Sequence, residues 1–236
     1  MSRAALQLVL SCEHAGNRIP RAFRAAFAPP ARVLASHRGF DPGSLELGRR
    51  LARAFDAPLF VNEVTRLLVD ANRSASNPDR LSKWALAMPA ALQERAAREV
   101  WAPHRDAVAA AVARALERGP VLHLSVHSFT PRLRGEVRDV DVGFLYDPRR
   151  ALERELVGAW LKALGAEEPR LRLRRNAPYR GTDDGLTTAL RQGFGADQYA
   201  GIELEVSQRF PRAASHARWR ALQRAIMVSL ARTTAD

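Results

Sequence analysis

The sequence contains very little cysteine, since Cys12 is the only one among 236 residues. A single cysteine excludes any disulfide within the chain, so the fold needs no oxidising compartment. No apolar run approaches the roughly 18 residues that a membrane-spanning helix requires. Residues 1–10 carry one arginine and no apolar run followed by a small-residue cleavage site, which argues against a secretory signal peptide. We therefore expect a cytoplasmic protein with no membrane partner.

Lysine is also scarce, with only Lys83 and Lys162, although arginine brings the formal net charge to +12. The arginines are spread along the whole chain, whereas a nucleic-acid-binding protein is expected to gather them on one face or in one tail. Charge alone supports little beyond non-specific association with nucleic acid. We therefore expect no specific nucleic-acid partner, and instead an electropositive pocket that attracts small anionic substrates.

Short apolar runs alternate with segments of helical periodicity. Helices are expected over 43–55, 81–118 (interrupted at Pro89 and Pro103), 151–164 and 215–232. Strands are expected over 6–11, 58–64, 67–69, 121–126, 140–146 and 200–206. This alternation predicts an α/β protein with a mostly parallel mixed sheet flanked by helices. We expect one domain over residues 1–236, with 167–175 as a loop or an edge element of the sheet.

Polar and ionisable residues follow several of these predicted strands. His14 comes after the first strand, residues 70–73 after the run 67–69, and His127 after 121–126. Glu203 and Glu205 lie in or at the end of the last strand. In open α/β sheets, ligands bind beyond the carboxyl ends of the strands. The sequence therefore predicts a functional site at this edge of the sheet.

The two histidines that follow strands favour a catalytic zinc site. A lone histidine is more often hydrogen-bonded in a turn, but His14 and His127 occupy equivalent places after two strands. Catalytic zinc takes three nitrogen or oxygen ligands and keeps one position open. The third ligand is then a carboxylate, either Asp41 or Glu13. Glu13 points away from His14 if the segment is still extended, so we prefer Asp41, which lies in the loop sequence GFDPG and is free to fold back.

Two arginines flank the run LLVDAN and indicate a carboxylate-binding clamp. Arg66 and Arg73 could each hold a carboxylate in a bidentate manner, although surface arginine is common in this chain. Asn72 could donate further hydrogen bonds to the substrate. Asp70 would orient an arginine or a metal ligand by a hydrogen bond, without itself contacting the metal or the substrate.

Glu205 is the candidate general base, because a carboxylate is needed to take the proton of the attacking water and pass it to the leaving amine. Glu203 lies two residues before it, on the same face of the strand, and could support it. His123 shares a face with His127 and either supports the site or is simply packed. The role of His104, in the sequence WAPHRD, is equally open.

Together, these residues resemble the N-formylglutamate amidohydrolase family, which is similar to the zinc carboxypeptidases. The likeness covers about residues 8–210. Its segments, in the order of the family, are LVLSCEHAGNRIP, HRGFDPGSLELGRRLA, TRLLVDANR, VWAPHRDAV, LHLSVHSFTP and GIELEVSQR.

The resemblance implies a zinc-carboxypeptidase-like hydrolase fold and a role for each matching residue. His14 and His127 would be zinc ligands, and Glu205 would be the catalytic glutamate. Asn72 and Arg73 would hold the substrate carboxylate. Arg66 would help to hold the substrate or polarise its carbonyl, and the segment 176–181, with Asn176 and Tyr179, would line the pocket.

The chain departs from the pattern at two positions. Zinc carboxypeptidases pair the first histidine with a glutamate three residues later, where this chain has Asn17. Many of the amidohydrolases carry proline before that histidine, where this chain has Glu13. These departures leave both Asp41 and Glu13 open as the third ligand, and they allow a sister branch with another N-acyl substrate.

The resemblance implies a zinc-dependent amidohydrolase that cuts N-formyl-L-glutamate to L-glutamate and formate. The alternatives are another N-acyl-amino-acid deacylase, a small-peptide carboxypeptidase, and a non-catalytic protein that retains the ligand pocket. Bound zinc and measurable turnover distinguish the enzymes from the binding protein.

Overall fold

The computed structural model describes residues 5–212 and 216–235. Its strands are β1 (Gln7–Cys12), β2 (Leu59–Val61), β3 (Val121–Phe129), β4 (Arg132–Leu133), β5 (Glu136–Val137), β6 (Val142–Leu145), β7 (Leu173–Arg175) and β8 (Tyr199–Ser207). Its α-helices are α1 (Ala31–Leu34), α2 (Ser44–Phe55), α3 (Lys83–Leu86), α4 (Ala90–Ala96), α5 (Ala102–Leu116), α6 (Ala151–Glu167), α7 (Leu186–Gly193) and α8 (His216–Thr234). Two 3-10 turns (Arg21–Phe23, Pro78–Arg80) and a π-helical segment (Ala97–Trp101) complete the set.

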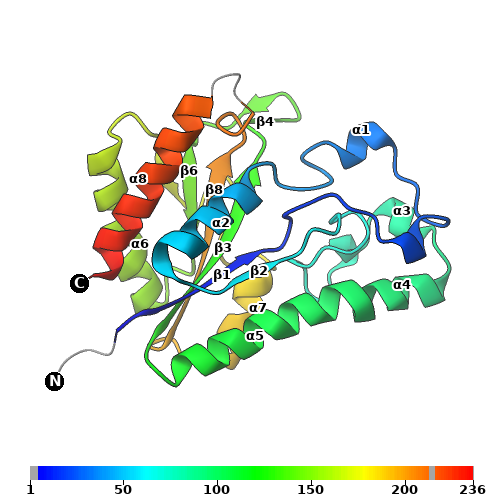
Figure 1. Cartoon of the computed structure of the whole chain (residues 1–236), viewed down its shortest axis with the longest axis horizontal. Coiled ribbons are helices and arrows are strands. Elements are labelled where there is room, and N and C mark those ends of the chain that lie inside the picture. Colours follow the sequence, from blue (N-terminus) through cyan, green and yellow to red (C-terminus); the bar gives the residue numbers. More distant parts are fainter. Residues whose placement is uncertain (1–4, 213–215, 236) are drawn as a thin grey trace.

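A six-stranded sheet with the order β2-β1-β3-β8-β6-β7 runs through the centre of the molecule. The strands β2, β1, β3 and β8 are parallel, and β6 runs antiparallel to β8. The helices α2, α6 and α8 cover one face, while α5 and α7 lie on the other (Figure 1). This is the mostly parallel mixed sheet flanked by helices that the alternation of runs predicted. The segment 167–175 ends in the edge strand β7.

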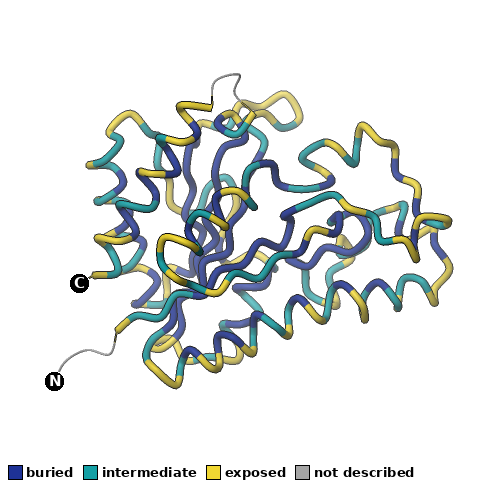
Figure 2. Tube along the Cα trace, viewed as in Figure 1, coloured by how far each residue is buried: buried dark blue, intermediate teal, exposed yellow. Residues whose placement is uncertain are grey.

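The period of two along each strand divides the core between the two faces of the sheet. On the side of α2, α6 and α8, alternate strand residues such as Leu122, Leu124 and Val126 are fully buried. On the side of α5 and α7, Val9, Val121 and Tyr199 form a smaller apolar cluster. Figure 2 shows the strands as the most continuously buried part of the chain. The apolar cover on both faces fixes the register of the strands that carry the polar residues.

The same face that packs against α5 and α7 becomes polar toward the carboxyl ends of the strands. Parallel pairing places Ser125 beside Glu203 and His127 beside Glu205. Neighbouring residues in register point to the same side of a sheet. The two glutamates of β8 and the histidine of β3 therefore share one side of the sheet.

The predicted strand over 67–69 is wrong, because these residues form a turn. Leu68 N donates to Thr65 O, and Asp70 N donates to Arg80 O, so neither takes part in the sheet. The side chains of Leu67, Leu68 and Val69 are buried instead in a separate apolar cluster with Phe23 and others outside the sheet. An apolar run of three residues shows burial but not the structure that buries it.

The predicted interruption at Pro103 is also wrong, since α4, the π-helical segment and α5 follow one another without a gap. Pro103 lies in the first turn of α5, directly after the π-helical segment. Proline lacks the N–H that a helix interior requires, and the wider π turn accommodates that missing donor. The helix therefore passes through Pro103.

Other boundaries differ slightly from the expectation. The start of the last predicted helix, residue 215, lies outside the described residues, and α8 is described from His216. The short helices α1 and α7 were not predicted. No helix in the described ranges is long and apolar enough to cross a membrane.

Candidate metal centre and active site

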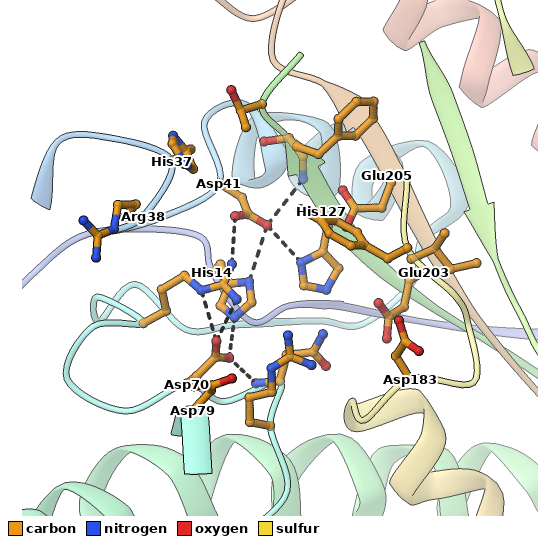
Figure 3. Close-up of a pocket in the computed structure, with 18 of the residues that line it drawn as sticks. His14, His37, Arg38, Asp41, Asp70, Asp79, His127, Asp183, Glu203 and Glu205 are labelled. Carbon is orange, nitrogen blue, oxygen red and sulfur yellow. Dashed lines mark hydrogen bonds and ion pairs between the residues drawn. The ribbon is translucent and has the colours of Figure 1, made fainter. Parts of the chain in front are cut away.

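A cavity of about 360 Å³ opens at the carboxyl ends of β1, β3 and β8. His14 reaches it from the loop after β1, Asp41 from the loop before α2, and His127 from β3 itself (Figure 3). Glu203 and Glu205 line it from β8. The predicted edge of the sheet therefore does carry a polar cavity.

His14, Asp41 and His127 meet at one point of this cavity. His127 Nδ1 lies 2.9 Å and His14 Nδ1 3.4 Å from Asp41 Oδ2. One nitrogen or oxygen atom from each of the three residues lies within 4.8 Å of the others, and all three residues are buried. The structure thus brings together the three residues that the sequence analysis selected as metal ligands.

Both imidazoles are held at the opposite nitrogen by a carboxylate. His14 Nε2 lies 2.6 Å from Asp70 Oδ1, and His127 Nε2 lies 3.0 Å from Glu13 Oε2. A carboxylate accepts from the ring nitrogen that carries the proton, which leaves the other nitrogen free to bind a metal. Both rings are therefore oriented with Nδ1 toward Asp41.

The electrostatics of this cluster favour a cation at its centre. Burial raises the pKa of Asp41, but His14, His127 and Arg66 outweigh burial and hold that pKa well below its ordinary value. Burial lowers the pKa of His127, but hydrogen bonds to Asp41 and Glu13 raise it well above the usual range. The carboxylates of Asp41 and Glu13 thus stabilise a positive charge on the imidazole that lies between them. A divalent ion would replace the proton at Nδ1 of each ring.

Two imidazole nitrogens and one carboxylate oxygen form a donor set that suits zinc with an open position. Asn17, three residues after His14, plays no part in this set, because its amide donates to Leu34 O. Glu13 is fully buried and contacts the far edge of the His127 ring, so it does not join the three residues. The donor set therefore fits zinc with Asp41 as the carboxylate.

Glu205 is the residue best placed to exchange a proton beside this centre. It is paired in register with His127 on the neighbouring strand, and its buried Oε2 has no hydrogen-bond partner in the part of the chain that the structure describes. Burial, together with the charges of Asp41 and Glu203, raises the pKa of Glu205 to about 8 against the opposing effects of His127 and Arg66. A nearby cation would lower that pKa again, toward the range in which a general base works.

Glu203 is held in place by a neighbour rather than by the cluster. Its Oε1 accepts a hydrogen bond from Thr187 Oγ1 on α7 at 2.9 Å. The close approach of residues 185–187 depends on Gly185, because a Cβ there would lie 2.9 Å from Glu203 Oε1. Glu203 thus contributes a fixed negative charge near Glu205.

Arg66 is paired with carboxylates rather than free. Its Nε and Nη2 donate to Asp70 Oδ2 at 3.0 and 2.7 Å, and its Nη1 lies 3.5 Å from Asp41 Oδ1. Asp70 also accepts a hydrogen bond from His14, so Arg66, Asp70 and His14 form one connected network of ion pairs and hydrogen bonds. Asp70 therefore orients both an arginine and a histidine, and Arg66 borders the cavity through its contact with Asp41.

Asn72 and Arg73 line the cavity, and the side chain of each is held by a hydrogen bond to the backbone of the segment 184–186. Asn72 Oδ1 accepts from Leu186 N at 2.7 Å, which leaves its NH₂ group for a ligand. Arg73 Nη1 donates to the carbonyl oxygen of Asp184 at 2.6 Å. Such anchoring limits the motion of both side chains at the wall of the cavity.

The segment 176–181 contributes unequally to the cavity. Tyr179 lines it, and the guanidinium of Arg138 lies over its ring and donates to its hydroxyl. Asn176 does not line it, because its Oδ1 accepts from Tyr146 N and Gly181 N in a turn. The structure thus places Tyr179 at the cavity and gives Asn176 a place in the loop.

Several cavity residues were missed by sequence reasoning. They lie in loops where no periodicity marks them, and the nearest signal was the neighbouring segment 176–181. They include His37, Arg38, Asp79, Asp183 and Asp184.

The profile of the N-formylglutamate amidohydrolase family matches residues 6–210. The chain belongs to the N-formylglutamate amidohydrolase family. Its members' activity makes the chain an amidohydrolase that acts on N-acyl amino acids, and the buried cluster of His14, Asp41 and His127 is its candidate metal site.

Two solved structures are similar to the chain over nearly its whole length. A gene product of Agrobacterium tumefaciens is 28% identical, with a TM-score of 0.82, and the match covers 98% of this chain and 92% of that one. The N-formylglutamate amidohydrolase of Ralstonia eutropha JMP134 is 20% identical, with a TM-score of 0.73 and coverage of 98% and 94%. A comparison with curated proteins gives no match. The second likeness shows a shared fold.

Proposed function

We propose that the whole chain, residues 1–236, forms one zinc-dependent amidohydrolase domain that hydrolyses N-formyl-L-glutamate to L-glutamate and formate. The observation that carries this proposal is the meeting of two imidazole Nδ1 atoms and the Asp41 carboxylate inside the cavity. His14, Asp41 and His127 would hold the ion. A zinc ion at such a site polarises a carbonyl and acidifies water.

Glu205 supplies the proton transfers of the reaction. As a carboxylate, it takes a proton from the water that attacks the formyl carbon. It then gives that proton to the amine as the C–N bond breaks, so that formate and the amino acid leave. Its burial, and the lack of a partner for Oε2 within residues 5–212 and 216–235, suit a group that changes its protonation state twice in each cycle.

Asn72 and Arg73 hold the α-carboxylate of the substrate, and Arg66 and Tyr179 border the same cavity. We expect Arg73→Ala to raise KM about 10–100-fold, because hydrogen bonds to charged groups contribute about 1.5–3 kcal/mol. The measurement is steady-state kinetics on an N-formyl amino acid and on its α-carboxamide. The matched control is Arg53→Ala, which removes an exposed arginine of α2 that does not line the cavity. An equal effect on both substrates would contradict the assigned role.

The decisive experiment combines metal analysis of freshly purified protein with formate release from a panel of N-formyl amino acids. N-acetylglutamate, N-succinylglutamate and dipeptides extend the panel. We expect bound zinc and the highest kcat/KM for N-formyl-L-glutamate. A preference for another acyl group would place the chain with a different deacylase, and cleavage of dipeptides would make it a small-peptide carboxypeptidase. Zinc without turnover on any substrate would leave a binding protein.

A further inference from the structure

Glu13 has no role in the reaction described so far, yet it is a fully buried carboxylate directly behind a proposed zinc ligand. Its Oε2 lies 3.0 Å from His127 Nε2. The Ser125 hydroxyl donates to the same oxygen at 2.6 Å and lies 2.8 Å from His127 Nε2. Glu13 and Ser125 therefore both engage the ring nitrogen that faces away from Asp41.

The geometry matches the arrangement on the other histidine. Asp70 accepts a hydrogen bond from His14 Nε2, and at His127 Nε2 the Glu13 carboxylate lies 3.0 Å away beside the hydrogen-bonded Ser125 hydroxyl. Asp70 comes from a turn outside the sheet, whereas Glu13 comes from the chain immediately after β1, so the two arrangements are built independently. Each has the same consequence, because a proton held on Nε2 makes Nδ1 the nitrogen at which a metal ion would replace a proton.

His104 supports Glu13 from α5. Its Nε2 lies 3.6 Å from Glu13 Oε1, and neither of these buried atoms has a hydrogen-bond partner among the described residues. A negative charge in this place is costly unless positive or polar groups surround it. His127, Ser125 and His104 surround it here.

We infer that Glu13 is a positioning residue, which fixes the tautomer and the orientation of His127 and so raises the affinity of the site for zinc. The inference rests on the proposed zinc site and deepens it. It assigns to Glu13 a place behind the histidine rather than in the ligand set. Outer carboxylates of this kind typically change metal affinity by about 10–100-fold.

The test is the zinc dissociation constant of Glu13→Gln, measured by competition with a chromogenic chelator. The substitution keeps the shape of the side chain and removes its charge. The matched control is Glu153→Gln, which changes another fully buried carboxylate that is paired with Arg191 and does not line the cavity. Circular dichroism establishes that each variant is folded.

We expect Glu13→Gln to weaken zinc binding at least tenfold, while Glu153→Gln binds zinc like the parent. The visible spectrum of the cobalt-substituted protein should be unchanged in Glu13→Gln, because the ligand set is unchanged. Ser125→Ala gives a second route if Glu13→Gln does not fold, since it removes the hydroxyl that holds Glu13 and should also weaken zinc binding. In the double variant the two effects should be less than additive, because both act through one ring nitrogen.

A weakening of less than tenfold in Glu13→Gln, or an equal weakening in Glu153→Gln, overturns the inference while the zinc site stands. An altered cobalt spectrum would make Glu13 a ligand and would overturn it as well. If Glu13→Gln does not fold, unchanged zinc affinity in Ser125→Ala overturns it. A parent protein that binds no zinc overturns both this inference and the proposed function, so the two failures are distinguishable.

Discussion

Two histidines on β3, His123 and His127, have the same residue type, share one face of the strand and are both buried, yet their surroundings differ completely. His123 lies between two hydroxyls, 2.8 Å from Ser11 Oγ and 2.8 Å from Tyr199 Oη. His127 lies between two carboxylates, Asp41 and Glu13. Burial thus dominates for His123 and lowers its pKa to about 4, whereas the carboxylates raise that of His127 well above the usual range.

The difference shows that the residues around each ring, and not the residue type or its periodicity, distinguish the structural His123 from the proposed metal ligand His127. Hydroxyls satisfy both nitrogens of a neutral ring without attracting a cation. Carboxylates on both sides make a place where positive charge is stable. The change occurs within four residues of one strand, as β3 passes from the apolar middle of the sheet to its polar edge.

The largest expected effect comes from removing the ligand itself. His127→Ala takes away one of the three donors, so we expect loss of both zinc and turnover, well beyond the about 10–100-fold effect of removing an orienting partner. Zinc content by plasma emission spectroscopy and formate release measure the two losses. If the His127→Ala protein keeps stoichiometric zinc, His127 is not a ligand and does not differ from His123 in the way proposed.

The next largest effect is expected from Glu205→Gln, which should impair catalysis without impairing metal binding at the same end of the sheet. We expect zinc to remain bound and kcat to fall about 10²–10⁴-fold, since general-base assistance contributes about that much. The measurement pairs kcat with zinc content. If the variant turns over at a near-normal rate, the base has been assigned to the wrong residue.

A smaller effect is expected from Glu203→Gln, which tests how the charge of a neighbouring carboxylate changes the pKa of Glu205. The negative charge of Glu203 helps to raise the pKa of Glu205. Because Glu205 must be ionised to act as a base, activity rises as pH increases through its pKa. Removing the like charge lowers that pKa, so the acid limb of kcat/KM should move to lower pH by a fraction of a unit. A shift in the opposite direction would contradict the assigned coupling.

The smallest effect on function is expected from His123→Gln. A glutamine amide cannot occupy the places of both ring nitrogens, so at least one of the buried hydroxyls of Ser11 and Tyr199 loses its partner, which should cost about 1–3 kcal/mol of unfolding free energy. Zinc affinity should be unchanged, because His123 contacts none of the proposed ligands. Urea unfolding and chelator competition measure the two quantities. Weaker zinc binding with unchanged stability would reverse the roles given to the two histidines.

Much of the fold could be predicted, because long elements repeat their pattern. Short apolar runs predicted β3 and β8, and the helical period predicted α2, α6 and most of α5. The turn at 67–69 could not be recognised, because three apolar residues are buried equally well by a strand or by a turn. The continuation of the helix through Pro103 could not be predicted, because it depends on a π-helical turn that has no recognisable sequence pattern.

The candidate site was predicted in its residue types more than in its contacts. His14, Asp41 and His127 were chosen for their places after strands or in a flexible loop, and the structure brings them together. The partnership of Glu13 with His127 could not be found, because it joins β1 to β3 across the sheet. The resemblance predicted that the segment 176–181 lines the cavity, but Asp183 and Asp184 beyond it carry no periodicity, and the packing of their loop places them there.

The sequence by itself determined the alternation of strands and helices, the edge at which reactive side chains collect, and the likeness to one family of amidohydrolases. These properties follow from the periods of 2.0 and 3.6 residues and from the order of short motifs. Only the tertiary structure decided which of two neighbouring histidines faces carboxylates, and which of two acidic residues meets the imidazoles at Nδ1. Those outcomes depend on contacts between residues 27 to 112 positions apart, which form when strands pair and loops close over them.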